Sequence, residues 1–303
     1  MDTLALLQIL TNALSLGSLY ALIAIGYTMV YGILRLINFA HGDIFMMSIY
    51  FAFYGIAMYY IPWPVTFILA IILTAVLGMV IEKAAYSPLR DAPKISVMIS
   101  AIGVSFFLES LAVLLFGAFT KAFPTIPIFT DVIKIGPVLL QRVNLFIPVL
   151  TIIFLTLLLL LINHTKIGMA MRALSKDYET ARLMGVNVNT VISMTFAIGS
   201  TLAAIGGIMY ALKYTAIQPF MGMMPGLKCF IAAVVGGIGN IKGAVIGGLL
   251  LGAGEIIIIT LPNLMGITLD LTGYRDAFAF IVLIIILLLR PTGIMGEKIS
   301  DKV

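Results

Sequence analysis

Long uncharged stretches, each close to the length that a membrane-spanning helix needs, recur along the whole chain. The first, Thr3–Leu34, contains no Asp, Glu, Lys or Arg. A helix needs roughly 20 mainly apolar residues to cross a bilayer, because each residue rises about 1.5 Å and the hydrocarbon core is about 30 Å thick. The stretches are continuously apolar instead of alternating, so they predict helices and not the strands of a membrane barrel.

The composition excludes most soluble classes of protein. Of the 303 residues, 62% are hydrophobic and 10% are charged, whereas a soluble domain is roughly 45–50% apolar and about 25% charged. So few charges cannot cover a water-facing surface, which excludes a soluble enzyme, a nucleic-acid-binding protein and a disordered chain. The one cysteine cannot form an internal disulfide, and no acidic or histidine cluster has the spacing of metal ligands. We therefore expect no metal and no cofactor.

The expected fold is all-α, a single polytopic domain over residues 1–303 with eight to nine transmembrane helices. A ninth segment, 227–239, is short and glycine-rich, and whether it spans or is only a half-helix stays open. The eight longer segments are 3–34, 38–60, 65–81, 95–119, 145–162, 190–212, 244–260 and 277–289.

Basic residues predict the orientation, because cytoplasmic loops carry an excess of Lys and Arg. With the loop 164–189 in the cytoplasm and the ninth segment spanning, twelve basic residues fall inside and six outside. The N-terminus is then outside and the C-terminus in the cytoplasm. The inside set is Arg35, Lys83, Arg90, Lys94, Lys166, Arg172, Lys176, Arg182, Lys242, Arg290, Lys298 and Lys302, and the outside set is Lys121, Lys134, Arg142, Lys213, Lys228 and Arg275.

Polar residues crowd the short connection between the first two predicted spans, where Asn38, His41, Gly42 and Asp43 lie within six residues. One interpretation is a broken or re-entrant segment that lines a pathway, because irregular backbone at membrane depth is tolerated only where protein or water satisfies it. The other is an ordinary cytoplasmic turn in which Asn38 or Asp43 caps the next helix.

Two acidic residues, Glu109 and Glu255, lie inside apolar segments. A lone carboxylate at membrane depth is costly, so each should face the interior of the bundle or be paired. Each is a candidate for a proton or substrate route. The alternative is a buried hydrogen bond that holds two helices together.

The longest charged stretch, 164–189, is predicted to be a cytoplasmic loop that contains a short amphipathic helix of about three turns. Ser175 is a suitable N-cap, Asp177 and Glu179 suit the positive end of a helix, and Gly185 suits the position after its end. The helix either docks into a groove of a soluble partner or lies in the membrane interface. It comprises Ser175, Lys176, Asp177, Tyr178, Glu179, Thr180, Ala181, Arg182, Leu183, Met184 and Gly185.

Small residues recur every four positions in two of the predicted spans, which lets helix backbones approach closely. The glycine-rich stretch 236–243 matches neither nucleotide-binding pattern. Lys242 stands where a dinucleotide loop needs Gly, and it precedes Gly243, whereas a phosphate loop needs Lys after Gly. We expect a tight turn between helices there. The small residues at four-residue spacing are Gly199, Ala203 and Gly207, then Ala244, Gly248 and Gly252.

Three sets of residues, in the same order along the chain, carry a family resemblance. The first is GSLYALIAIG at 17–26 with INFAHGD at 37–43; the second is Arg172-Ala173 with ARLMGVN at 181–187. The third is AAVVGGIG at 232–239, followed by two further Gly-containing pairs. With these residues the chain resembles the LivH-type permease subunits of bacterial ABC importers for branched-chain amino acids, and the resemblance covers essentially the whole chain.

The resemblance implies partners and a mechanism. Such a permease pairs with a second, similar but different permease subunit in the bacterial inner membrane. Two cytoplasmic ABC ATPase subunits hydrolyse ATP, so the permease itself is not an enzyme, and a periplasmic binding protein delivers leucine, isoleucine or valine. By this resemblance, residues 175–185 form the coupling helix that docks into an ATPase cleft. Residues 38–43, with Glu109 and Glu255, are possible translocation-path or gating positions.

Other functions remain to be weighed. A related ABC importer for a sugar or a nucleoside would have a similar permease. An ion-coupled secondary transporter would need intramembrane acids near broken helices, and Glu109 and Glu255 are its candidates. A membrane-embedded enzyme would need clustered acids, histidines or basic residues near one face, and the sequence offers none.

Overall fold

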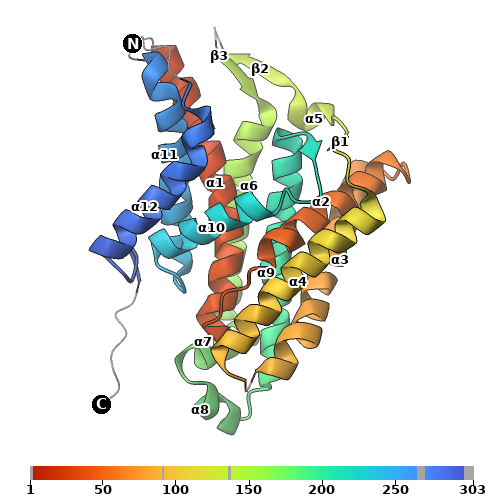
Figure 1. The fold of residues 1–303 in the computed structure, drawn as a ribbon, viewed down its shortest axis with the longest axis vertical. Helices are drawn as coiled ribbons and strands as arrows, with labels where there is room; N and C mark the ends of the chain where they lie inside the picture. Colours follow the sequence, from red (N-terminus) through yellow and green to blue (C-terminus); the bar gives the residue numbers. More distant parts are fainter. Residues whose placement is uncertain (1–2, 91, 136–137, 265–269, 297–303) are drawn as a thin grey trace.

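The computed structural model describes residues 3–90, 92–135, 138–264 and 270–296. Within them, seven helical segments are long and apolar enough to cross a membrane. Two shorter apolar helices, α2 (His41–Ala57) and α10 (Met223–Gly236), lie among them (Figure 1). The expected all-α fold is confirmed. The long helices are α1 (Thr3–Leu34), α3 (Trp63–Ile81), α4 (Lys94–Phe116), α6 (Arg142–His164), α9 (Val188–Lys213), α11 (Ile241–Leu264) and α12 (Arg275–Leu289).

Short elements join these helices. The predicted loop between the fourth and fifth long segments holds a small helix and a two-stranded antiparallel hairpin, in which Val132 pairs with Gln141. A second, two-residue ladder pairs Lys121 with Ile217. The connecting elements are the π-helix η1 (Glu82–Tyr86), η2 (Ser87–Leu89), β1 (Lys121–Ala122), α5 (Pro127–Thr130), β2 (Val132–Ile135), β3 (Val138–Gln141), α7 (Lys166–Lys176), α8 (Tyr178–Leu183), β4 (Ala216–Ile217) and η3 (Thr272–Tyr274).

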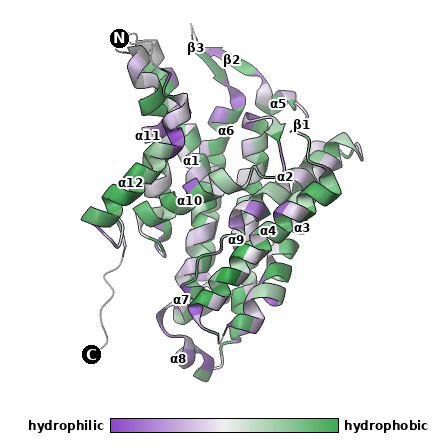
Figure 2. Ribbon diagram, in the orientation of Figure 1, coloured by the Kyte–Doolittle hydropathy of each residue, from purple (hydrophilic) through white to green (hydrophobic). Residues whose placement is uncertain are grey.

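Polar and apolar residues separate along the long axis of the molecule. The N-terminus and the β2–β3 hairpin lie at one end, and α7 and α8 lie at the other (Figure 1). Hydrophilic residues gather around α7 and α8, and the long helices between the two ends are mostly hydrophobic (Figure 2). This is the pattern of a protein whose middle lies in hydrocarbon and whose ends face water.

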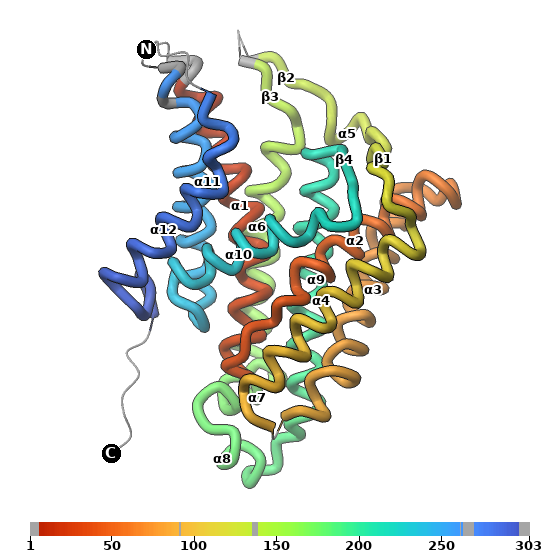
Figure 3. The backbone as a smooth tube through the Cα atoms, viewed as in Figure 1, coloured from red at the N-terminus to blue at the C-terminus, as the bar shows by residue number. Residues whose placement is uncertain are grey.

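The elements are arranged around the two short helices in the same way twice. Helix α1 packs on α11 and on α10, just as α9 packs on α3 and on α2. Likewise α2 contacts α3 and α4, and α10 contacts α11 and α12. Helix α1 runs toward the end that carries α7 and α8, and α9 runs away from it (Figure 3). The two halves, α1–α4 and α9–α12, are therefore inverted copies of one arrangement, as in many transporters.

Close packing at small residues holds the centre of the bundle together. A Cβ atom on Gly248 of α11 would meet the Cα and Cβ atoms of Ala21 on α1, so only a residue without a side chain fits there. The prediction of close helix packing from the four-residue spacing is confirmed at this crossing. The predicted turn at 236–243 is confirmed as well, because α10 ends at Gly236 and α11 begins at Ile241.

Candidate functional site

The polar connection between α1 and α2 is buried inside the bundle. Helix α1 ends where Arg35 takes a positive φ of 52°, and residues 35–40 are not helical before α2 begins at His41. Asn38, His41 and Asp43 are 3%, 1% and 2% exposed. This burial excludes the surface turn, and no side chain caps α2. The broken-segment geometry is therefore present, and its role in a pathway stays a prediction.

Each polar side chain of this segment contacts a different part of the bundle. Asn38 Oδ1 accepts a hydrogen bond of 2.7 Å from the Tyr86 hydroxyl in the π-helix. Asp43 Oδ2 accepts one of 2.5 Å from Ser105 Oγ on α4. The His41 ring packs against Tyr27 of α1, with 4.3 Å between ring centroids. The segment is thus fixed from three sides.

The first turns of the two short helices meet at glycines. A Cβ atom on Gly226 of α10 would lie 2.8 Å from the Cα atom of Gly42, and one on Gly42 would lie 3.1 Å from the Cα atom of Gly226. Side chains at these positions would push α2 and α10 apart. The predicted site residue Gly42 therefore sets the distance between the two half-helices.

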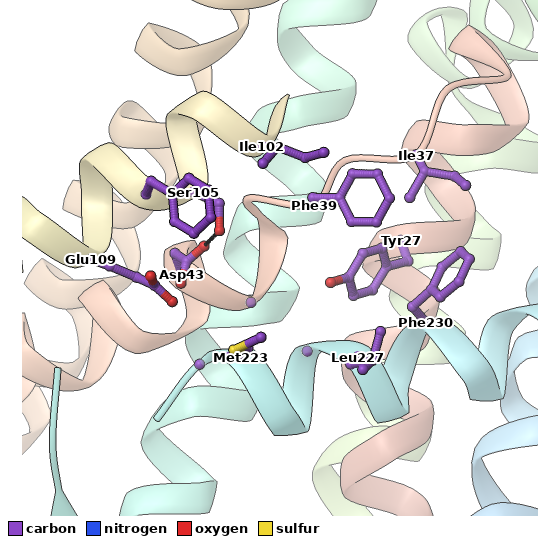
Figure 4. A pocket seen from close by; sticks show the side chains of 14 residues that line it. Tyr27, Ile37, Phe39, Asp43, Ile102, Ser105, Glu109, Met223, Leu227 and Phe230 are labelled. Carbon is purple, nitrogen blue, oxygen red and sulfur yellow. Dashed lines mark hydrogen bonds between the residues drawn. The ribbon is translucent and has the colours of Figure 1, made fainter. Parts of the chain in front are cut away.

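A cavity of about 180 Å³ opens beside this crossing. Its walls come from α1, the segment before α2, the start of α2, α4 and α10, and most of them are apolar (Figure 4). Of the predicted residues, Gly42, Asp43 and Glu109 line it, whereas Asn38 and His41 are buried outside its lining. The lining residues are Tyr27, Ile37, Phe39, Gly42, Asp43, Ile102, Ser105, Phe106, Glu109, Gly222, Met223, Gly226, Leu227 and Phe230.

Glu255 lies elsewhere, in a buried ion cluster. Its carboxylate is 3.0 Å from Lys228 Nζ of α10 and accepts a 3.0 Å hydrogen bond from the Tyr20 hydroxyl of α1. Lys228 Nζ is also 2.7 Å from Asp276 at the start of α12. This arrangement agrees with the second interpretation of Glu255, a buried hydrogen bond that holds two helices together. It also corrects the placement of Lys228 in an outside loop, because Lys228 is only 9% exposed.

The predicted coupling helix is shorter than expected and begins later. Ser175 lies inside α7, where its Oγ donates to the Arg172 carbonyl over 2.8 Å, so it is not the N-cap. Asp177 is the cap: its Oδ1 accepts from the backbone N–H groups of Glu179 and Thr180 at 3.1 Å. The cap is Asp177 and not the predicted Ser175, because α7 continues through Lys176. The break between α7 and α8 therefore lies two residues later than predicted.

The end of the same helix matches the prediction. Gly185 has a φ of 85°, its N–H donates to the Arg182 carbonyl, and the next N–H, of Val186, donates to the Ala181 carbonyl. This is the Schellman arrangement that glycine favours after a helix. Leu183 and Met184 are 87% and 80% exposed. Thus α8 presents an apolar tip at the end of the molecule opposite the N-terminus (Figure 1).

Sequence reasoning missed several residues of the cavity. Ser105 is one of them: it stands four positions before the predicted residue Glu109 on α4, so the two share one helix face, and this spacing could have pointed to it. Nothing in the sequence pattern singles out Tyr27. A buried pair at the π-helix was also missed, in which Arg90 Nη2 lies 2.6 Å from Glu82 Oε1.

Comparison with known proteins gives consistent matches over the chain. The chain is 40% identical to the high-affinity branched-chain amino acid transport system permease protein BraD of Pseudomonas aeruginosa, over 98% of both chains. It is 38% identical to the permease protein LivH of Escherichia coli, over 98% of this chain and 97% of that one. Among solved structures, PsaBC from Streptococcus pneumoniae in complex with Fab shares the fold, with a TM-score of 0.51 at 13% identity, over 94% of this chain and 92% of that chain. The model of the family described as the permease component of the branched-chain amino acid transport system matches residues 9–287. The chain belongs to this permease family.

Proposed function

We propose that this chain is a permease subunit of an ATP-driven importer for leucine, isoleucine and valine. The observation that carries the proposal is the near full-length similarity to permeases named for high-affinity branched-chain amino acid transport. The ribose import permease RbsC of Escherichia coli is 29% identical over only 43% of this chain. A sugar is therefore the weaker substrate assignment.

Membership of the family and the position of α7 and α8 at one end of the chain support the following assembly. A second permease subunit completes the translocation path, two cytoplasmic ABC ATPase subunits supply the energy, and a periplasmic binding protein delivers the amino acid. The N-terminus faces the periplasm and the α7–α8 end faces the cytoplasm of the bacterium. Removing buried Lys228 from the outside set leaves five basic residues there against twelve inside, which strengthens this orientation.

The second permease subunit covers the cavity beside α4 and α10. The cavity holds the carboxyl groups of Asp43 and Glu109, and its walls include the exposed side chains of Phe106 and Met223, at 64% each. Carboxyl groups beside open hydrocarbon are costly, so protein or water has to border this cavity. A partner chain on this face supplies that border.

Transport in a reconstituted system tests the function. The chain is co-expressed with its neighbouring permease, ATPase and binding-protein genes, purified in mild detergent and placed in proteoliposomes. We expect ATP-dependent uptake of leucine, and ATP hydrolysis that rises when the binding protein and leucine are added together. Uptake of ribose in place of leucine would move the assignment to the sugar branch. Uptake by the chain alone under a proton or sodium gradient would refute the importer.

The apolar tip of α8 is the proposed contact with an ATPase. Changing Leu183 and Met184 together to Ser removes two exposed apolar side chains and should lower binding-protein-stimulated ATP hydrolysis about tenfold, since losing an interface anchor costs roughly 1–2 kcal/mol. Leu139→Ser, at the opposite end and 54% exposed, is the matched control. A loss of similar size in the control would show that the effect is not a docking effect.

A further inference from the structure

The cavity beside α2 contains an unsatisfied acid. Asp43 is 2% exposed, and one carboxylate oxygen accepts the hydrogen bond from Ser105. The other, Oδ1, is buried and has no hydrogen-bond partner among the described residues. Buried polar atoms of proteins are almost always hydrogen-bonded, so an orphaned carboxylate oxygen at the wall of a cavity indicates a missing donor.

A second carboxylate faces the same space. Glu109 of α4 lines the cavity together with Asp43. Figure 4 shows both carboxyl groups on the same side of the cavity, with Ser105 beside them. No Lys or Arg side chain of the described residues lines it. The electrostatic complement of this wall is therefore a cation that donates several hydrogen bonds.

The remaining lining residues indicate the chemistry of the rest of the ligand. Opposite the acids, the wall consists of the aromatic and aliphatic side chains of Phe39, Leu227 and Phe230, and Ile102 adds an aliphatic side chain one turn before Ser105 on α4 (Figure 4). Such an apolar wall offers no ligand atoms to a small metal ion. A primary ammonium with three N–H donors and a short aliphatic chain fits both sides at once.

We propose that this cavity is a transit site for an aliphatic amino acid, in which Asp43 and Glu109 bind the ammonium group and the apolar wall holds the side chain. The proposal rests on the proposed function and adds the recognised group and the residues that recognise it. The site lies where α2 and α10 begin, and those two helices touch through Gly42 and Gly226. A shift of one half-helix against the other would thus open or close it.

Chemical labelling tests the site directly. Ser105→Cys puts a thiol at the acidic wall, and the chain's own Cys229 is fully buried, so the unmodified permease is the background control. In the reconstituted complex without binding protein, a cationic methanethiosulfonate should react about tenfold faster than an anionic one, because two carboxylates attract it. Millimolar leucine or 3-methylbutylamine should slow the reaction. The deaminated analogue 4-methyl-2-oxopentanoate, which lacks the ammonium, should not. Equal rates with both reagents, or equal protection by the oxo acid, would overturn the proposal.

Transport by charge-neutral variants gives a second test. Asp43→Asn and Glu109→Gln should each lower leucine uptake about tenfold, the loss expected for one charged hydrogen bond. Uptake should fall more than binding-protein-stimulated ATP hydrolysis, so leucine moved per ATP decreases. Asp131→Asn, an exposed acid at the far end, is the control. If Asp43→Asn does not assemble, the Glu109→Gln result decides.

Leucine uptake by the unmodified complex distinguishes a failure of the proposed function from a failure of the transit site. If it takes up no leucine, the proposed function fails before any variant is read. If it takes up leucine and both variants transport leucine at the unmodified rate, the transit site fails and the importer stands.

Discussion

At the scale of single residues, the buried charges of this chain are arranged in two different ways. Lys228 binds Glu255 and Asp276 and so holds α10, α11 and α12 together. Asp43 has only the Ser105 hydroxyl on one oxygen and no partner on the other among the described residues. A paired cluster stabilises a fold, and an incomplete one is available to a ligand.

Removing Lys228 should therefore destabilise the chain strongly. Lys228→Met leaves the Glu255 carboxylate buried with the Tyr20 hydroxyl alone, and losing one partner of a buried pair costs roughly 3–5 kcal/mol. Thermal unfolding in detergent, followed by the fluorescence of a thiol-reactive dye at Cys229, measures the loss.

Two further variants show whether the loss of stability comes from the buried charge or from packing. Glu255→Met on top of Lys228→Met should restore much of the stability, because the uncompensated charge is gone. Arg142→Met breaks the ion pair between Arg142 and Asp131. The two side chains are 40% and 50% exposed, so the variant should lose less than about 1 kcal/mol of stability. A double variant as unstable as the single one would show that Lys228 acts by packing and not by charge.

At the scale of elements, helix crossings depend on a few small residues. Gly248→Ile places a branched side chain against Ala21 on α1 and should force α1 and α11 apart, lowering the melting temperature and the yield of folded protein. Gly103→Ala is the matched control, because a Cβ atom there would meet nothing within 4 Å. Alanine should even stabilise α4 slightly, by up to about 1 kcal/mol. Equal losses in the two variants would contradict the packing argument.

The elements also show what the sequence can predict. Long apolar runs and glycine after α8 are local signals, so the long helices and the stop at Gly185 were predicted. The start of α8 was not, because Ser175 and Asp177 are both good caps and the choice depends on where α7 ends. The cavity was missed as a unit, because Asp43, Ser105 and Glu109 meet only through the packing of α2 on α4. Burial of Asn38 was left open for the same reason.

At the scale of the whole molecule, the two inverted halves and the connection between them place the cavity and the apolar tip of α8 in different parts of the bundle. Helices α1–α4 and α9–α12 place the two half-helices at the centre, where the cavity lies. The connection between the halves, through α6, α7 and α8, places an apolar tip at one end. Rocking of one half against the other, driven at α8, would act on the α2–α10 contact. If an ATPase docks at α8 and the cavity is the transit site, as proposed above, this motion would couple the two without direct contact.

The proposed coupling at α8 requires a fixed orientation in the membrane, which labelling of single cysteines can determine. Cys229 is buried and should not react, so the unmodified chain should not be labelled. Leu183→Cys on α8 should react with a membrane-impermeant maleimide only in inside-out vesicles. Asp131→Cys, beside the hairpin at the other end, should react only in right-side-out vesicles. These outcomes place the N-terminal end in the periplasm, because it lies at the same end as the hairpin (Figure 1). The opposite labelling pattern would reverse the chain and remove α8 from reach of any cytoplasmic ATPase.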